Sequence, residues 1–143
     1  MKTSTWMRGL LAAGSLCLPA AAAQDLKYGA PIPAVHRTLF EKGLGFLVEQ
    51  QQDNGSWGSN SGVAGICIMA LLASGEAPNF GLYAEPVRKG VRYIINQQNA
   101  DTGFIRSGMY EHGFAMLTLA DCYGAVDDRL LWKGQEKKGR SIG

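Results

Sequence analysis

Two stretches of the chain repeat one pattern at an interval of 47 residues. The aligned positions share apolar, glycine or glutamine residues. Residues 42–47 align with 89–94, 50–51 with 97–98, and Trp57 with Phe104. After a one-residue slip, residues 65–71 align with 113–119. Repeats of this length are typical of arrays in which one supersecondary unit stacks on the next. We therefore expect two copies of one unit, in residues 35–76 and 77–124.

Each unit is expected to be a helical hairpin. Residues 35–51 and 85–99 carry apolar side chains at helical spacing with charged residues between them, which is typical of a helix that faces water on one side. Residues 62–74 contain no charged residue, and in residues 112–123 the single charge is Asp121. A helix that is apolar all round is expected to be buried on every side. The predicted fold class is therefore all-α, with a surface helix and an interior helix in each hairpin.

Residues that favour helix ends stand between these segments. The side-chain oxygens of Ser59, Asn60 and Ser61 are candidate N-caps for the first interior helix. Gly75 and Gly124 stand where the two interior helices are expected to end.

The composition is that of one small globular domain: 143 residues, of which 46% are hydrophobic and 18% charged. The formal net charge of +2 comes from 14 Lys and Arg against 12 Asp and Glu. Two of the basic residues, Lys2 and Arg8, precede Gln24, so the charges of the remaining chain balance. A neutral chain without a basic stripe has no electrostatic reason to bind nucleic acid, and that class of partner is excluded.

The first 23 residues have the pattern of a secretory signal peptide. Lys2 and Arg8 precede the apolar run 9–20, and small residues follow it, so cleavage is expected near Ala23. The apolar run is shorter than the roughly 20 residues that a membrane span needs. We expect a chain exported to the periplasm or the medium, without a membrane span after cleavage. A buried N-terminal helix is the alternative.

The cysteines do not form a disulfide framework. Cleavage would remove Cys17, and its use as a lipoprotein anchor is disfavoured because the large Leu16 precedes it. Cys67 and Cys122 remain, each inside an apolar helical segment, where a free thiol behaves as a small apolar side chain. We expect these two cysteines to be unpaired.

The repeated segments carry a spaced motif of basic, glycine, aromatic and glutamine residues. In the first copy these are Lys42, Gly43, Phe46, Gln51, Gly55 and Trp57, and in the second Lys89, Gly90, Tyr93, Gln98 and Phe104. Thr102 stands at the second glycine position, with Gly103 after it. The motif resembles the QW-type repeat of the squalene and terpene cyclases and the related protein prenyltransferases, over residues 35–123. The resemblance implies an α/α toroid, in which surface helices form an outer ring and apolar helices line a central cavity.

These residue types suit a structural role. The aromatic side chain can stack on the glutamine amide, and the amide can bond the loop backbone or the start of the next helix. Glycine permits the sharp turn between antiparallel helices. The motif therefore predicts a fold and no reaction.

Two hairpins cannot close a ring, so the interior helices are expected to leave an exposed apolar patch. Further repeats of the same chain would cover this patch if residues 1–143 are an N-terminal fragment, and self-association would cover it otherwise. Residues 24–34 are then a linker, and residues 125–143 are a linker or the start of a further repeat.

No complete catalytic motif is found. The resemblance implies an Asp-x-Asp-Asp acid motif or an aspartate-rich magnesium site, and Asp127-Asp128 supplies only part of either. The zinc site of the prenyltransferases uses Asp, Cys and His. Here Asp121 and Cys122 point about 100° apart on a helix, and His112 lies more than two turns earlier. No catalytic residue, metal or cofactor is predicted.

Tyr110, Glu111 and His112 form the remaining cluster of interest, at the junction of loop and helix in the second unit. The toroid interpretation places them at the cavity mouth, where His112 could bind a ligand or move a proton. The alternative is that Tyr110 and His112 pack the helix start, while the helix dipole favours Glu111 there.

The function predicted from these observations is that of an exported, non-catalytic repeat protein. Its inner-helix face would bind an apolar ligand or another protein. One alternative is the N-terminal part of a terpene-cyclase-like or prenyltransferase-like enzyme whose catalytic motif lies outside this chain. A second alternative is carbohydrate-lyase-like chemistry on the same kind of toroid. Only the expected export of the chain supports it.

Overall fold

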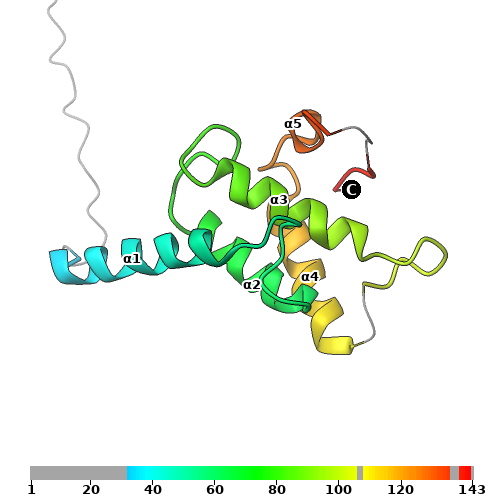
Figure 1. The fold of residues 1–143 in the computed structure, drawn as a ribbon, viewed down its shortest axis with the longest axis horizontal. Coiled ribbons are helices and arrows are strands. Elements are labelled where there is room, and N and C mark those ends of the chain that lie inside the picture. The colour runs from blue at the N-terminus through cyan, green and yellow to red at the C-terminus, as the bar shows by residue number, and fades with distance from the viewer. Residues whose placement is uncertain (1–31, 106–107, 136–138, 143) are drawn as a thin grey trace, which may run out of the picture. The chain divides into compact units, whose positions relative to one another are not determined.

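The computed structural model describes residues 32–105, 108–135 and 139–142 (Figure 1). These residues form the helices α1 (Ala34–Gln50), α2 (Ser61–Leu72), α3 (Ala84–Asn96), α4 (Met109–Cys122) and the short α5 (Asp128–Leu131). Within the described ranges the only extended pairing is a bridge between Gln98 and Ile105. The all-α prediction is therefore confirmed for this part of the chain. The expected signal peptide, residues 1–23, lies outside the described residues.

The helix ends agree with the expected signals. The side chain of Asn60 caps α2, because its Oδ1 accepts hydrogen bonds from the backbone N–H of Gly62 (2.8 Å) and Val63 (3.1 Å). Gly75 and Gly124 follow α2 and α4 with φ of 80° and 79°, a conformation that glycine adopts without a steric penalty.

The centre of the structure is the packing of α2 along α4 and against α3 (Figure 1). A Cβ added at Gly65 of α2 would lie 2.6 Å from Thr118 Oγ1 and 3.0 Å from the Phe114 carbonyl oxygen of α4. Glycine at this position therefore lets the two inner helices approach at backbone distance. The largest fully buried apolar side chains belong to one core cluster: Ile68, Leu71, Ile94, Ile105, Leu131, Val87 and Val91.

Helix α3 departs from the expected surface position. It buries 8 of its 13 residues, because α2 covers one side and the segment around α5 covers another. Arg92 is buried and donates to the Leu131 carbonyl oxygen (2.7 Å) and to Glu85 (2.9 Å). The prediction that this helix faces water along one whole side is corrected, because the charged side chain of Arg92 lies inside the fold and is paired there.

Helices α2 and α4 depart in the opposite direction. Both are rich in apolar residues, yet Val63 and Ile66 of α2 and Phe114 and Leu117 of α4 are exposed. Burial on every side is therefore not reached, and the open sides form part of the apolar patch that two hairpins were expected to leave. In the described residues α2, α3 and α4 pack on one another along some sides only, and the remaining sides stay open.

Helix α1 is the most exposed of the long helices. Leu44 is its only buried residue, and its N-terminal half extends beyond the other helices in Figure 1. Among the described helices, including α1, none has the length and apolar character required to cross a bilayer.

Candidate binding face

The first copy of the repeat motif forms a bonded junction between the hairpins. Gln51 Nε2 donates to the carbonyl oxygens of Gly55 (3.1 Å) and Pro86 (2.9 Å), so it joins its own loop to the first turn of α3. Trp57 Nε1 donates to the Leu47 carbonyl oxygen (2.6 Å). The bond to the loop backbone is the kind expected from the sequence, whereas the second bond reaches α3 and not the start of α2, the next helix along the chain.

The glycine of this loop is required by its position. Gly55 has φ of 90°, and a Cβ there would collide with the Lys89 carbonyl oxygen. At Gly90, the next residue, a Cβ would lie 2.8 Å from Ile68 and 3.2 Å from Trp57. The motif residues Lys89 and Gly90 of the second copy are therefore the surface on which the first loop packs.

The second loop has the same bonds, displaced by one residue. Gln98 Nε2 donates to the Gly103 carbonyl oxygen (3.2 Å), and Gly103 has φ of 72°. The backbone bond from Asn99 to Phe104 (2.8 Å) repeats the bond from Gln52 to Ser56 (2.9 Å). Gly103 is thus the counterpart of Gly55. The expected pairing of Phe104 with Trp57 is corrected. When the two loops are aligned by their structure, Phe104 corresponds to Ser56, and the buried Ile105 corresponds to Trp57.

The cluster at the start of α4 is occupied by packing and hydrogen bonds. His112 Nδ1 accepts a hydrogen bond from the Ile105 N–H (3.1 Å), and its ring stacks on Phe104 with centroids 4.3 Å apart. Glu111 accepts from Asn60 Nδ2 (2.7 Å), across the contact between α4 and α2. Tyr110 is exposed. His112 and Glu111 therefore join the two hairpins and the second loop.

The aspartate pair near the end of the chain has structural partners. Asp127 caps α5 through the Arg129 N–H (2.9 Å) and pairs with the Arg129 guanidinium (2.7 Å), which lowers the pKa of the Asp127 carboxyl. Asp128 Oδ1 accepts from the Ile142 N–H (3.0 Å). The two aspartates therefore stand at the N-terminal end of α5 and have structural partners there.

The three residues considered for zinc do not form a donor cluster. Asp121 is exposed, Cys122 is buried in the core, and His112 uses Nδ1 on the second loop. Across the described ranges, no three His, Cys, Asp or Glu side chains gather closely enough to hold a metal ion.

Cys67 and Cys122 are both buried as free thiols. Burial raises the pKa of Cys67, and burial with the nearby Asp121 charge raises the pKa of Cys122 to about 12. At neutral pH Cys122 is therefore a protonated apolar side chain and an unreactive one.

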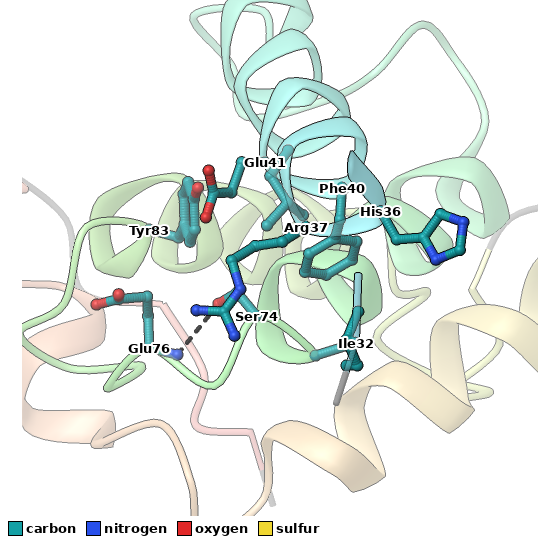
Figure 2. Close-up of a pocket in the computed structure, with 10 residues that line it drawn as sticks. Ile32, His36, Arg37, Phe40, Glu41, Ser74, Glu76 and Tyr83 are labelled. Carbon is teal, nitrogen blue, oxygen red and sulfur yellow. Dashed lines mark hydrogen bonds between the residues drawn. The ribbon is translucent and has the colours of Figure 1, made fainter. Parts of the chain in front are cut away.

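A cleft with a volume of about 480 Å³ lies between α1 and the segment that follows α2 (Figure 2). Arg37, Glu41, Glu76 and Tyr83 surround its opening, while His36 points away from them. The hydrogen bond drawn among the lining residues joins the Glu76 N–H to Ser74 Oγ (3.2 Å). The ionisable groups of this cleft are thus solvated at its edge, and they do not form a pre-arranged acid–base pair.

Exposed apolar side chains follow one another along α2 and α4. We call the surface that they form the inner face and define it by Ile66 of α2 and Tyr110, Phe114 and Leu117 of α4. Ile66 and Phe114 occupy the same repeat position, and 47% and 41% of their surfaces are exposed. The repeat thus places a large apolar side chain in water at the same point of both hairpins.

The sequence predicted an exposed apolar patch on these helices without identifying its residues. The signal that could have identified these residues is the position of each side chain around its helix. On α4, the buried Ala115, Thr118 and Cys122 point toward the core, Phe114 lies at the edge of that side of the helix, and Leu117 lies farther round, away from the core.

No protein-family model matches the chain, and no solved structure matches it.

Proposed function

We propose that the chain is an exported repeat protein of the QW type, related to the terpene cyclase and prenyltransferase toroids, and that its inner face binds an apolar ligand. Two observations support the proposal. Gln51 and Gln98 each donate to a carbonyl oxygen of the loop that follows, and each hairpin presents a large apolar side chain at the same position of its inner helix.

The exposed pair Ile66 and Phe114 is the observation that carries the binding function. Exposing large apolar side chains to water costs free energy. Monomeric proteins therefore seldom gather such side chains on one surface unless a ligand or a partner covers them. Burying a fully exposed side chain of this size is worth about 1.5–3 kcal/mol, and covering one of these half-exposed side chains is worth roughly half of that. Because the backbone groups of α2 and α4 are satisfied within the helices, the surface between these side chains is apolar.

An extended isoprenoid chain suits this surface better than a compact polar molecule. The inner-face residues Ile66, Phe114 and Leu117 carry no charge, and hydrocarbon contact supplies affinity without a polar partner. The resemblance of the repeats favours the same ligand class.

The test is a titration with farnesol, read by displacement of the dye 8-anilinonaphthalene-1-sulfonate from the purified protein. We expect Ile66→Glu and Phe114→Glu to weaken farnesol binding at least about tenfold, equal to ~1.4 kcal/mol. A charge on the inner face has to be desolvated when the ligand covers it.

Matched controls come from the connection between α2 and α3, where Phe80 and Leu82 are also exposed. Phe80→Glu and Leu82→Glu make the same kind of chemical change outside the inner face and should retain wild-type affinity. Equal binding by all four variants, or no displacement by farnesol, would show that the inner face does not bind this class of ligand.

A further inference from the structure

The contact between the two hairpins has a defined set of partners. The Ile68 side chain of α2 fills the space beside Gly90 of α3, and Trp57 packs on the same glycine. The Lys89 carbonyl oxygen lies where a side chain of Gly55 would be. Between the inner helices, Gly65 lies against Phe114 and Thr118. We call this contact between the two hairpins the junction, and we compare the two ends of the array with it.

The first end lies on α1. By the interval of 47 residues, Gly43 is the counterpart of Gly90, and a Cβ at Gly43 has no neighbour within 4 Å. Phe40 is 47% exposed, whereas its counterpart Val87 is 1% exposed. We call Phe40, Gly43 and Phe46 the leading face. Its positions are open, whereas their counterparts on α3 are buried and one of them, Gly90, lies in the junction.

The neighbouring position agrees. Phe46 is 59% exposed, whereas its counterpart Tyr93 is 6% exposed. The side chain at this position is therefore aromatic in both copies, but only the copy inside the array is covered. A large aromatic side chain in water is costly, and a partner that covers it gains affinity.

The second end lies on α4. By the interval of 48 residues, Met116 is the counterpart of Ile68, and it is 44% exposed whereas Ile68 is fully buried. Gly113 is the counterpart of Gly65, and a Cβ at Gly113 has no neighbour within 4 Å. We call Gly113 and Met116 the trailing face.

We propose that the trailing face of one copy of this chain docks on the leading face of a second copy. Met116 would then pack beside Gly43 of the next copy, as Ile68 packs beside Gly90 within one chain. The occupant is inferred from continuity with the intrachain junction, because the two ends carry its two complementary halves. Such a contact is heterologous, so it adds copies head to tail until a ring closes or a filament grows.

The proposal goes beyond ligand binding and does not depend on it. Phe114 of the inner face also lies against Gly65 in the junction, so the two surfaces adjoin. The leading face and the trailing face nevertheless contain none of the inner-face residues, and assembly is measured without ligand. A failed farnesol titration therefore leaves this proposal intact, and the reverse also holds.

The test is the mass of the purified protein in solution, measured by sedimentation velocity without ligand over a range of concentrations. We expect wild-type protein to form species heavier than one chain, and Gly43→Glu to remain a single chain. Gly45→Glu is the matched control, because it places the same side chain two residues along α1 where a Cβ also meets nothing within 4 Å. It should assemble like wild type.

A mixing experiment separates head-to-tail docking from a symmetric dimer. Gly113→Glu blocks the trailing face and should also remain a single chain. An equimolar mixture of Gly43→Glu and Gly113→Glu retains one intact junction and should form a dimer of one copy each. Circular dichroism and thermal unfolding will establish that each variant folds.

Three results would overturn the proposal: single-chain wild-type protein at every concentration, equal masses for Gly43→Glu and Gly45→Glu, or no dimer in the mixture of folded variants.

Discussion

At the residue scale, the same type of residue has opposite roles in the two copies of the motif. Gly90 is enclosed by Ile68 and Trp57, whereas Gly43, at the equivalent position, faces open space. In the first case glycine is required because any side chain would meet the neighbouring hairpin. In the second it provides no packing in the monomer and only lowers the helix propensity of α1.

Alanine substitution of the two glycines should therefore have effects of opposite sign. Gly90→Ala should lower the free energy of unfolding by about 1–3 kcal/mol, because its Cβ overpacks the contact with Ile68. Gly43→Ala should raise the same free energy by about 0.5–1 kcal/mol, because alanine favours a helix more than glycine does. Urea unfolding at a concentration where both proteins are single chains measures the two changes. Equal losses in both variants would contradict the assigned junction.

At the element scale, burial depends on neighbours as much as on a helix's own pattern. The sequence predicted the four long helices and their ends closely, because apolar spacing, Asn60 and the terminal glycines are local signals. It did not predict which helix is covered. Helix α3 has a polar stripe, but Arg92 on that stripe bonds Glu85 on the same helix and the carbonyl oxygen of Leu131, which is distant in the sequence.

The second loop shows the same limit on a smaller scale. The sequence alignment pairs Phe104 with Trp57 because both are aromatic. The structure aligns Gly103 with Gly55 instead, because the positive φ and the bond from Gln98 are needed at that point of the turn. Aromatic character was a weaker guide than backbone conformation.

The ion pairs at the start of α3 predict a pH dependence. Burial alone would raise the pKa of Glu85, but hydrogen bonds and charges from Arg92 and Arg88 lower the net value below the usual 4.5. A lowered pKa in the folded state stabilises the fold above the unfolded-state value. That contribution is lost as pH falls below about 4.5, through the folded-state pKa.

The expected size is modest, because Glu85 is largely exposed and solvent screens the pairs. Relative to Glu85→Gln, wild-type protein should lose an additional ~0.3–1 kcal/mol of unfolding free energy between neutral pH and pH 3. Urea titrations at both pH values measure this difference. A variant that loses as much stability as wild type would show that the pairs with Arg88 and Arg92 do not stabilise α3.

At the scale of the whole molecule, the two hairpins form an array with an apolar inner face and two open ends. The exposed patch was predictable from the sequence, since two charge-free helices cannot cover each other completely. Its residues were not, because the side of α4 that meets α2 depends on the close approach at Gly65. The inner face and the cleft beside α1 are thus separate candidate sites, and only the inner face repeats in both hairpins.

The inner face is tested most directly by photolabelling with a diazirine derivative of farnesol, followed by mass-spectrometric mapping of the labelled residues. The account predicts labels on Ile66, Phe114 and Leu117, reduced by an excess of unmodified farnesol. Labels confined to Phe40 and Tyr83 would place the ligand in the cleft beside α1. That result would contradict the assignment of the inner face as the binding surface.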